Sequence, residues 1–265
     1  MKNQKLIVIT SNQLPHKYFI NQLDKHFSLS AVFIENFEYP TPTFKTEDEE
    51  KVWNEFFFLR KKTEDSLLHF SSRNSNLDRP VFFNIEKGAL NNNETLQLIS
   101  SFNPTKIIIF GTSLLRVKYL ELFPNCIFNL HVGLSQYYRG SSCNFWPIYD
   151  LRPDLIGATI HFVSAGIDDG KIVMQDKIKL NDYDSEFELM IKPIMLGTSL
   201  MIKTINKDIS NIITAKSPLK KGKLCLIRDF SPQAILKVRE HVSSGKLKNK
   251  IIETLNLQLK PLFRL

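Results

Sequence analysis

The alternation of short apolar runs with longer amphipathic stretches restricts the fold of this sequence more than any other feature. Lys5–Thr10 and Leu29–Ile34 are apolar runs bounded by polar residues, and Phe19–His26 between them has the spacing of a helix. Lys106–Phe110 contains three consecutive isoleucines and a phenylalanine, which is typical of a strand buried on both faces of a parallel sheet. The pattern predicts an α/β fold with a doubly wound, Rossmann-like and mostly parallel sheet.

The same order of elements continues along the chain. The acidic residues Glu47–Glu50 precede apolar positions at helical spacing, so a long helix is expected over Thr46–His69, because negative side chains favour a helix N-terminus. Ser185–Ile209 has the pattern of a long amphipathic helix, with Asp182 and Asp184 as candidate caps. Three further elements are predicted: a strand beginning at Arg79, a helix over Asn93–Phe102 and a strand that carries Asn129.

The pattern changes near residue 209. Lys223–Arg228 predicts a short strand, and Ser231-Pro232 can start a final helix that runs to Val242. We therefore expect a main α/β domain over residues 1–209 and a small C-terminal α+β appendage over residues 210–265, packed on the core.

The composition is that of a globular protein. With 265 residues and 43% hydrophobic side chains, the chain can bury a large core. The three cysteines, Cys126, Cys143 and Cys225, are widely spaced, which argues against a disulfide framework or a zinc cluster and fits a reducing cytoplasm. No apolar run approaches the length that a bilayer requires, so no membrane partner is expected.

The net charge of +8 is carried largely by the end of the chain. Many lysines and arginines lie between Lys216 and Lys250, with few acidic residues among them. One interpretation is a positive field that attracts a phosphorylated substrate, and the other is an ordinary solvated surface. We favour the solvated surface, so the charge by itself does not indicate a nucleic-acid partner.

Asn129 and His131 are the strongest candidates for chemistry. Residues two apart on a strand point to the same face, so the Asn129 amide and the His131 imidazole are expected side by side at a strand end. Asp168 follows in the segment Gly166–Gly170. An amide donor, a titratable ring and a carboxylate are the groups that acyl transfer to an amine requires, because two of them can hold a developing oxyanion and one can manage protons.

Other interpretations of these residues stay open. Asn129 and His131 could bridge backbone groups at the strand end. His131, His161 and Asp168 could form a metal site, although Asn129 would then lack a role, and no metal is expected. His161 on its own is interpreted as a core or supporting histidine, and Asp169 is the alternative carboxylate.

Five sequence elements around these residues occur in a characteristic order. They are Asn129-x-His131, the loop Tyr138-Arg139-Gly140, a Trp-Pro-Ile helix start at Trp146, the strand Gly157-x-Thr159-x-His161, and Ile167-Asp168-x-Gly170-x-Ile172. In this combination the sequence resembles the 10-formyltetrahydrofolate-dependent formyltransferases, the family of glycinamide ribonucleotide and methionyl-tRNA formyltransferases. The resemblance implies an enzyme in which Asn129, His131 and Asp168 match the family's catalytic triad.

The resemblance also implies the formyl donor, N10-formyltetrahydrofolate, as a co-substrate. Its pterin is expected against the backbone of the loop that follows Phe110 and against a second wall near Asp168. The implied donor-binding residues are Gly111, Ser113, Leu114 and Leu115 in the loop, and Gly166 and Ile167 in the second wall. Asn129 and a protonated His131 would hold the developing oxyanion, while Asp168 would favour the imidazolium and accept the proton of the amine, directly or through one water.

The acceptor is inferred by comparison with three kinds of family member. Thr10–Pro15 lacks the glycines of the phosphate loop of glycinamide ribonucleotide enzymes, and the residues after Ile209 look too few for the five-stranded barrel of methionyl-tRNA enzymes. His131–Pro147 is similar to the matching loop of sugar N-formyltransferases, which act on nucleotide-linked amino sugars of bacterial surface polysaccharides such as the lipopolysaccharide O-antigen.

A nucleotide-diphosphate amino sugar is therefore the expected acceptor. Arg139 could pair with its diphosphate and Tyr138 could contact its sugar or nucleotide, although both residues could instead fix the loop. The resemblance implies a cytoplasmic homodimer that binds no nucleic acid. The alternatives are a methionyl-tRNA or purine-pathway formyltransferase and a non-catalytic folate-binding module.

Overall fold

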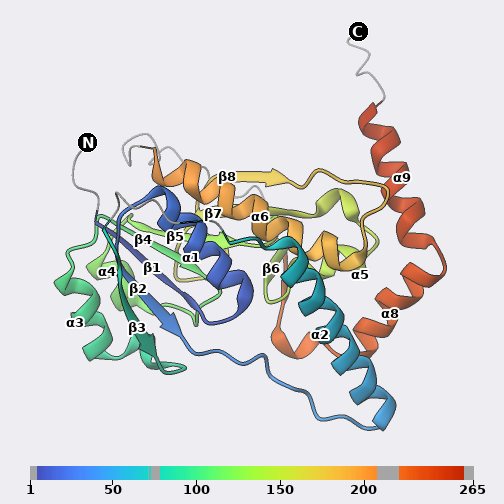
Figure 1. The fold of residues 1–265 in the computed structure, drawn as a ribbon, viewed down its shortest axis with the longest axis horizontal. Helices are drawn as coiled ribbons and strands as arrows, with labels where there is room; N and C mark the ends of the chain where they lie inside the picture. The colour runs from blue at the N-terminus through green and yellow to red at the C-terminus, as the bar shows by residue number, and fades with distance from the viewer. Residues whose placement is uncertain (1–4, 71, 73–77, 208–220, 260–265) are drawn as a thin grey trace.

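A seven-stranded sheet forms the centre of the computed structural model, which describes residues 5–70, 72, 78–207 and 221–259. The strand order is β3-β2-β1-β4-β5-β7-β8 (Figure 1). The strands from β3 to β5 are parallel, whereas β7 is antiparallel to β5 and β8 is antiparallel to β7. The strands are β1 (Leu6–Ser11), β2 (Leu29–Glu35), β3 (Val81–Ile85), β4 (Lys106–Phe110), β5 (Ile127–His131), β7 (Gly157–Phe162) and β8 (Ile172–Lys177). The prediction of an α/β fold with a mostly parallel, doubly wound sheet is confirmed.

Two helix layers cover the two faces of the sheet. Val8 packs in one core with helices α1 and α6, and its neighbour Ile7 packs in another core with helices α3 and α4. Successive side chains of a strand point to opposite faces, so these two cores lie on opposite sides of the sheet. The helices are α1 (Leu14–His26), α3 (Asn93–Ser101), α4 (Val117–Leu122) and α6 (Glu186–Ile205).

The first two helices show how local signals determine helix starts. Helix α1 begins at Leu14 rather than at the predicted Phe19, with Pro15 in its first turn, where a missing N–H is not needed by the helix. Helix α2 (Glu47–Leu67) matches the predicted long helix. The Thr46 hydroxyl caps it by accepting a hydrogen bond from the Glu49 N–H at 3.3 Å.

Helix α6 is capped by Ser185, and the prediction of Asp182 or Asp184 as the cap was wrong. The Ser185 hydroxyl accepts from the Glu188 N–H at 3.2 Å, and the Glu188 carboxylate accepts from the Ser185 N–H at 2.8 Å. This reciprocal capping box satisfies two N–H groups at once, so it is preferred over a single acidic cap. The helix ends at Ile205, and residues 208–209 of the predicted helix lie outside the described residues.

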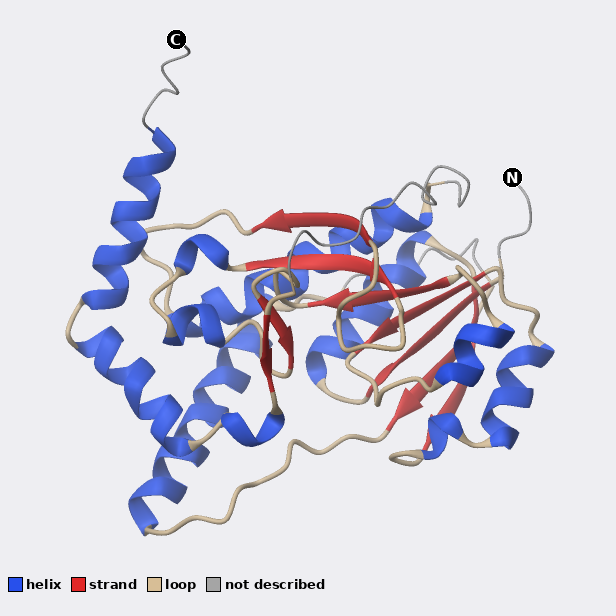
Figure 2. Ribbon diagram, turned by 180° about the vertical axis from the view of Figure 1, so that it is seen from behind, coloured by secondary structure: helices blue, strands red, loops and turns tan. Residues whose placement is uncertain are grey.

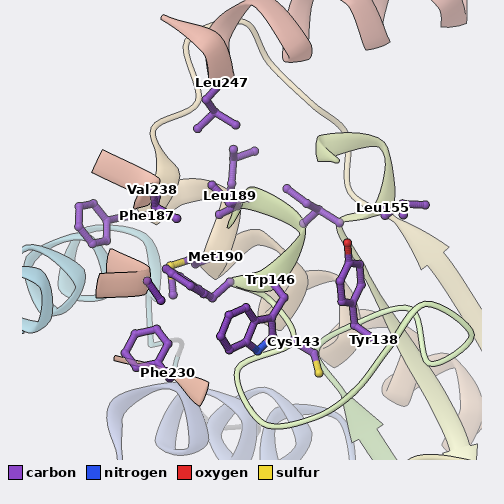
Figure 3. Packing of buried hydrophobic residues seen from close by; sticks show 14 of the residues in the cluster. Tyr138, Cys143, Trp146, Leu155, Phe187, Leu189, Met190, Phe230, Val238 and Leu247 are labelled. Atoms are coloured by element: carbon purple, nitrogen blue, oxygen red, sulfur yellow. The ribbon is translucent and has the colours of Figure 1, made fainter. Parts of the chain in front are cut away.

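The C-terminal residues pack against the preceding part of the chain. Strand β9 (Lys223–Cys225) pairs in parallel with β6 (Tyr138–Gly140). Helix α8 (Pro232–Ser243) packs against α2 and the short α5 (Trp146–Tyr149). Phe230 lies in a third hydrophobic core that joins these segments (Figure 3). The predicted domain boundary after residue 209 falls outside the described residues and stays a prediction.

Two features of this segment differ from the prediction. Strand β9 stops before Arg228, because the chain turns at Leu226 into a short 3-10 helix, where the Asp229 carboxylate accepts from the Leu226 N–H at 2.7 Å. After the predicted helix, a second helix that was not predicted, α9 (Lys246–Leu259), extends away from the sheet (Figure 2). In the described part of the chain, no helix has both the length and the apolar character needed to cross a bilayer.

Candidate active site

Two of the predicted catalytic residues lie at the carboxyl end of β5. Asn129 and His131 share this strand and line the same cavity. In the antiparallel ladder between β5 and β7, Asn129 lies opposite His161. Asp168 reaches them from the loop after β7, where its backbone has a left-handed φ of 46°. The three residues therefore converge where open α/β sheets bind ligands, beyond the carboxyl ends of strands.

The Asp168 carboxylate joins the cluster. Its Oδ1 accepts from Nδ2 of Asn129 at 3.0 Å and lies 3.3 Å from Nε2 of His161. Its Oδ2 accepts from the Gly140 N–H at 2.8 Å and lies 3.3 Å from Nδ1 of His131. The structure thus brings Asn129, His131 and Asp168 together, with His161 as a fourth member.

The geometry bears on two alternatives for these residues. Asp169 points away from the cluster, since its carboxylate accepts from the Ser164 hydroxyl at 2.5 Å and pairs with Lys221 at 2.9 Å. Of the two neighbouring carboxylates, Asp168 is the one in the cluster. No group of three or more His, Cys, Asp or Glu side chains in the described ranges is arranged to hold a metal ion.

Burial and hydrogen bonding determine the charge of the cluster. Burial opposes ionisation of Asp168, but the imidazoles of His131 and His161 and the Gly140 N–H outweigh it and hold the pKa of this carboxyl well below its usual range. Burial lowers the pKa of His131, and the Asp168 carboxylate partly offsets this effect. Near neutral pH, Asp168 is therefore ionised and His131 is mainly neutral.

Both ring nitrogens of His131 face hydrogen-bond acceptors. Nδ1 faces Asp168, and Nε2 lies 2.9 Å from the carbonyl oxygen of Tyr138. A neutral imidazole donates to only one of these acceptors, whereas an imidazolium donates to both. The surroundings of the ring therefore favour uptake of a proton, although burial opposes it. For His131 to hold an oxyanion as expected, Nε2 would have to leave the Tyr138 carbonyl. Asn129 would likewise have to give up one of its two contacts, with Asp168 or with His161.

His161 controls one hydrogen of the Asn129 amide. Nδ1 of His161 lies 2.7 Å from the carbonyl oxygen of Phe162 and so carries a hydrogen, and Nε2 lies 3.0 Å from Nδ2 of Asn129. A neutral His161 accepts from Asn129 at Nε2, whereas a protonated ring would donate to Asp168 instead. This agrees with the interpretation of His161 as a supporting histidine. The sequence element that carries His161 is the strand Gly157-x-Thr159-x-His161, which pairs with the strand of Asn129 in the structure.

A cavity of about 640 Å³ lies against this cluster, within the size range of small-molecule sites. Asn129, His131 and Asp168 line it, together with every residue predicted to bind the formyl donor. Those residues are Gly111, Ser113, Leu114, Leu115, Gly166 and Ile167. Tyr138 and Arg139, which were predicted to contact the acceptor, are not among the lining residues.

Comparison with known proteins identifies the family. The Formyl transferase family matches residues 41–205, which is more than half of the chain. The chain belongs to this family.

The curated relatives of this formyltransferase family member share only part of their length with it. The methionyl-tRNA formyltransferase of Thermodesulfovibrio yellowstonii is 31% identical over 122 residues, which are 46% of this chain and 39% of that protein. The methionyl-tRNA formyltransferase of Caldicellulosiruptor saccharolyticus is 31% identical over 136 residues, which are 49% of this chain and 42% of that protein. The chain thus spans less than half the length of either relative.

Solved structures share the fold over most of the chain. A sugar N-formyltransferase from Shewanella sp. FDAARGOS_354 has a TM-score of 0.54 at 16% identity, over 85% of this chain and 78% of that chain. The phosphoribosylglycinamide formyltransferase of Anaplasma phagocytophilum has a TM-score of 0.58 at 15% identity, over 85% of this chain and 98% of that chain. Identities this low show a common fold and leave the acceptor open.

Arg139 and Tyr138 of this formyltransferase family member hold the loop beside the cluster. Arg139 donates from Nε to the Gly222 carbonyl at 3.0 Å and from Nη1 to the Ile167 carbonyl at 2.9 Å. The Tyr138 hydroxyl donates to Asp150 at 3.0 Å. These contacts agree with the alternative that both residues fix the loop, and their contact with an acceptor stays a prediction.

The loop predicted to hold the donor is shaped by Gly111 and by a carboxylate that was not predicted. Gly111 has a φ of 63°, and a Cβ at this position would lie 2.3 Å from Nε2 of His16, so a larger residue does not fit. The buried Glu35 carboxylate accepts from the Ser113 N–H at 2.7 Å and from the Gly88 N–H at 2.9 Å. Glu35 therefore fixes the loop through the Ser113 N–H.

Four more lining residues were also missed from the sequence. They are His16, Tyr39, Arg60 and Lys87. They come from the start of α1, the linker after β2, helix α2 and the loop after β3. No spacing motif connects these segments, so only the folded chain brings them together.

Proposed function

We propose that this protein transfers a formyl group from N10-formyltetrahydrofolate to the amine of a nucleotide-linked amino sugar. The convergence of Asn129 and His131 on the Asp168 carboxylate, in the wall of a ligand-sized cavity, is the observation that carries the proposal. Membership in the Formyl transferase family supports the same reaction class.

The cavity offers the surfaces that the pterin of the donor would need. Ile109, Leu115 and Val163 supply apolar surface, and the peptide groups around Gly111 and Ile167 can meet a polar ring edge. The donor would supply the formyl carbon. The residues that would hold it are Gly111, Ser113, Leu114 and Leu115 on one wall and Gly166 and Ile167 on the other.

Each residue of the cluster has a distinct task in the proposed reaction. A neutral acceptor amine attacks the formyl carbon, and negative charge develops on the formyl oxygen. Asn129 donates to that oxygen by exchanging the contact of Nδ2 with His161 for the oxyanion, and removing one such donor costs about 2.7 to 4 kcal/mol of transition-state stabilisation. Asp168 accepts the proton that the amine loses, directly or through one water. His131 shares this proton, because its protonated ring would donate to both Asp168 and the Tyr138 carbonyl.

Two observations support an amino sugar as the acceptor. The segment Ser11–Gln13 before helix α1 has no glycine, and Pro15 in its first turn has no N–H, so this helix start is not a backbone phosphate cradle. Residues 221–259 contain one short strand and two α-helices, and this part of the chain is not a five-stranded barrel. With the similarity of His131–Pro147 to sugar N-formyltransferases, these features favour an amino-sugar acceptor. The resemblance extends the proposal to a cytoplasmic homodimer that serves surface-polysaccharide synthesis, including that of the O-antigen.

Methionyl-tRNA is the second candidate acceptor. The observation in its favour is that relatives 31% identical to this chain are named methionyl-tRNA formyltransferases.

An acceptor panel tests the proposal. The protein is incubated with N10-formyltetrahydrofolate and, separately, with nucleotide-linked amino sugars, glycinamide ribonucleotide and methionyl-tRNA, and mass spectrometry detects the added formyl group. Turnover of an amino sugar in preference to the other acceptors supports the proposal. Turnover of methionyl-tRNA alone would favour the second candidate. Binding of the folate without turnover of any acceptor would favour a folate-binding module.

A further inference from the structure

Charge is distributed unevenly around the cavity. Among its described lining residues, Asp168 is the one carboxylate, and it belongs to the catalytic cluster. The two cationic lining residues are Arg60, on helix α2, and Lys87, in the loop after β3. Away from the Asp168 cluster, the described side chains that line the cavity therefore include two cations and no carboxylate, which favours an anionic group of the ligand.

Arg60 is held in a fixed orientation with its outer nitrogens unused. Its Nε donates to the carboxylate of Glu64 at 2.8 Å, one turn further along α2, and Glu64 is buried. Its terminal nitrogens have no hydrogen-bond partner among the described residues. A guanidinium offers a planar fork of N–H donors that matches the oxygens of a phosphate. Arg60 is therefore positioned to donate to a ligand.

His16 adds an unused polar group beside Arg60. Its side chain is only 8% exposed, and Nδ1 has no hydrogen-bond partner within the described ranges. Burial, with a contribution from the charge of Arg60, lowers the pKa of His16 to about 3. The ring is therefore neutral near neutral pH. A buried polar group without a partner is costly, and a ligand in this cavity would supply one.

Tyr39 connects this wall to the catalytic cluster. Its hydroxyl lies 3.0 Å from Oγ of Ser142, in the loop whose Gly140 N–H binds Asp168. The ring of Phe37 lies edge-on to Tyr39 with a centroid distance of 6.3 Å, and Nζ of Lys87 lies 5.4 Å from the Phe37 ring centre. Aromatic surface next to cations is the combination that binds a nucleobase and its phosphates.

We propose that Arg60, with Lys87 and His16, binds the diphosphate of the acceptor, and that Phe37 and Tyr39 face its nucleoside. The inference rests on the proposed function for the identity of the acceptor. It assigns to Arg60 the task that the sequence suggested for Arg139, whose Nε and Nη1 are occupied by backbone carbonyls. The subsite itself requires only a phosphate anion, so it can be tested without the sugar.

Calorimetric titration with inorganic pyrophosphate tests the subsite in the full-length protein. Arg60→Gln is compared with Lys61→Gln, a matched control, because Lys61 is the next residue on α2 and makes an equivalent i,i+4 ion pair with Asp65 at the surface. We expect Arg60→Gln to weaken pyrophosphate binding by about tenfold or more, since charge-assisted hydrogen bonds are lost, and Lys61→Gln to bind as the wild type does. Equal affinity of all three proteins, or no binding by the wild type, overturns the proposal.

A second variant guards against a folding defect. Arg60→Gln leaves the buried Glu64 without its partner, whereas Lys87→Gln breaks no ion pair among the described residues. Circular dichroism confirms that each variant is folded. Weaker pyrophosphate binding by folded Lys87→Gln supports the subsite, and unchanged binding by both folded variants contradicts it.

Steady-state kinetics show which anion Arg60 binds: the diphosphate of the acceptor or the glutamate carboxylates of the folate. We expect Arg60→Gln to raise the KM of the acceptor about tenfold and to leave the KM of the donor unchanged. A rise confined to the KM of the donor would assign Arg60 to the folate tail and overturn the proposal. Arg60-dependent pyrophosphate binding without formylation of any nucleotide-linked sugar would support the subsite and refute the proposed acceptor class.

Discussion

Oδ2 of Asp168 lies 3.3 Å from Nδ1 of His131, and only 5% of the His131 side chain and 13% of the Asp168 side chain are exposed. The carboxylate stays ionised because its pKa is depressed, and the imidazole lies between this charge and the Tyr138 carbonyl. A proton arriving at the cluster can therefore be shared between two groups without contact with bulk water. In the proposed reaction, this coupling would let both residues take part in one proton transfer.

Replacement of His131 tests the proton-sharing pair. His131→Gln is expected to lower kcat by about 10² to 10⁴-fold, because glutamine cannot take up a proton. His241→Gln is the control, since His241 is another buried histidine whose Nε2 lies 3.1 Å from a backbone carbonyl, that of Tyr149, and it does not line the cavity. Equal kcat values for the two variants in a steady-state assay would show that His131 has only a structural role.

Removal of the Asn129 amide tests the oxyanion contact. Asn129→Ala is expected to lower kcat by about 10² to 10³-fold with a small change in the KM of the donor, because the contact forms as charge develops. Steady-state kinetics with both substrates varied provide the measurement. A higher KM with an unchanged kcat would mean that Asn129 binds the ground state only.

The donor loop can be tested with two glycines that both have a positive φ. The Cβ of Gly88→Ala would have no atom within 4 Å. The variant therefore loses only the stability that a side chain costs at the φ of 84°, about 1 to 2 kcal/mol. Gly111→Ala has a similar backbone cost and also collides with His16. We expect Gly111→Ala to be the less stable variant in urea unfolding and to raise the KM of the donor. Equal stabilities would show that the loop adjusts without cost.

Acid should destabilise the protein through His16. Its pKa is about 3 in the folded protein, compared with the ordinary value of 6.5 for the unfolded chain. Between these two pH values the unfolded chain binds more protons, so the stability falls as the pH drops below about 6.5. From pH 7 to pH 5 this residue should remove about 2 kcal/mol from the free energy of unfolding. Over the same pH range, the free energy of unfolding of His16→Gln should fall by about 2 kcal/mol less than that of the wild type. Parallel losses in urea titrations of both proteins would contradict the assignment.

The strands that are buried on both faces could be predicted well, because such burial leaves a direct record in the sequence. Lys106–Phe110 has the same bounds in the prediction and in the structure. The start of helix α1 could not be placed, because Pro15 and His16 break the apolar pattern although the helix includes both residues. Helix α9 was missed since its pattern continues from α8 after a single turn at Gly245, whose φ is 74°.

The cluster of Asn129, His131 and Asp168 could be predicted in part from strand periodicity. The two-residue period of a strand placed Asn129 and His131 on one face, and the observed hydrogen bonds bring Asp168 to them. Arg60 and Lys87 could not be predicted as lining residues, since they lie on segments that are far apart in the sequence from the cluster and from each other. The use of Arg139 was equally hidden, because its partners are backbone carbonyls from two distant segments.

The rate of formyl transfer by Asp168→Asn tests the central claim most directly. Asparagine tolerates the left-handed φ of 46° at this position, so the variant removes the charge without adding backbone strain. With Asp169→Asn as the neighbouring control, we predict that kcat falls by about 10² to 10⁴-fold for Asp168→Asn and stays within about threefold of wild type for the control. A kcat of Asp168→Asn equal to that of the wild type would contradict the account.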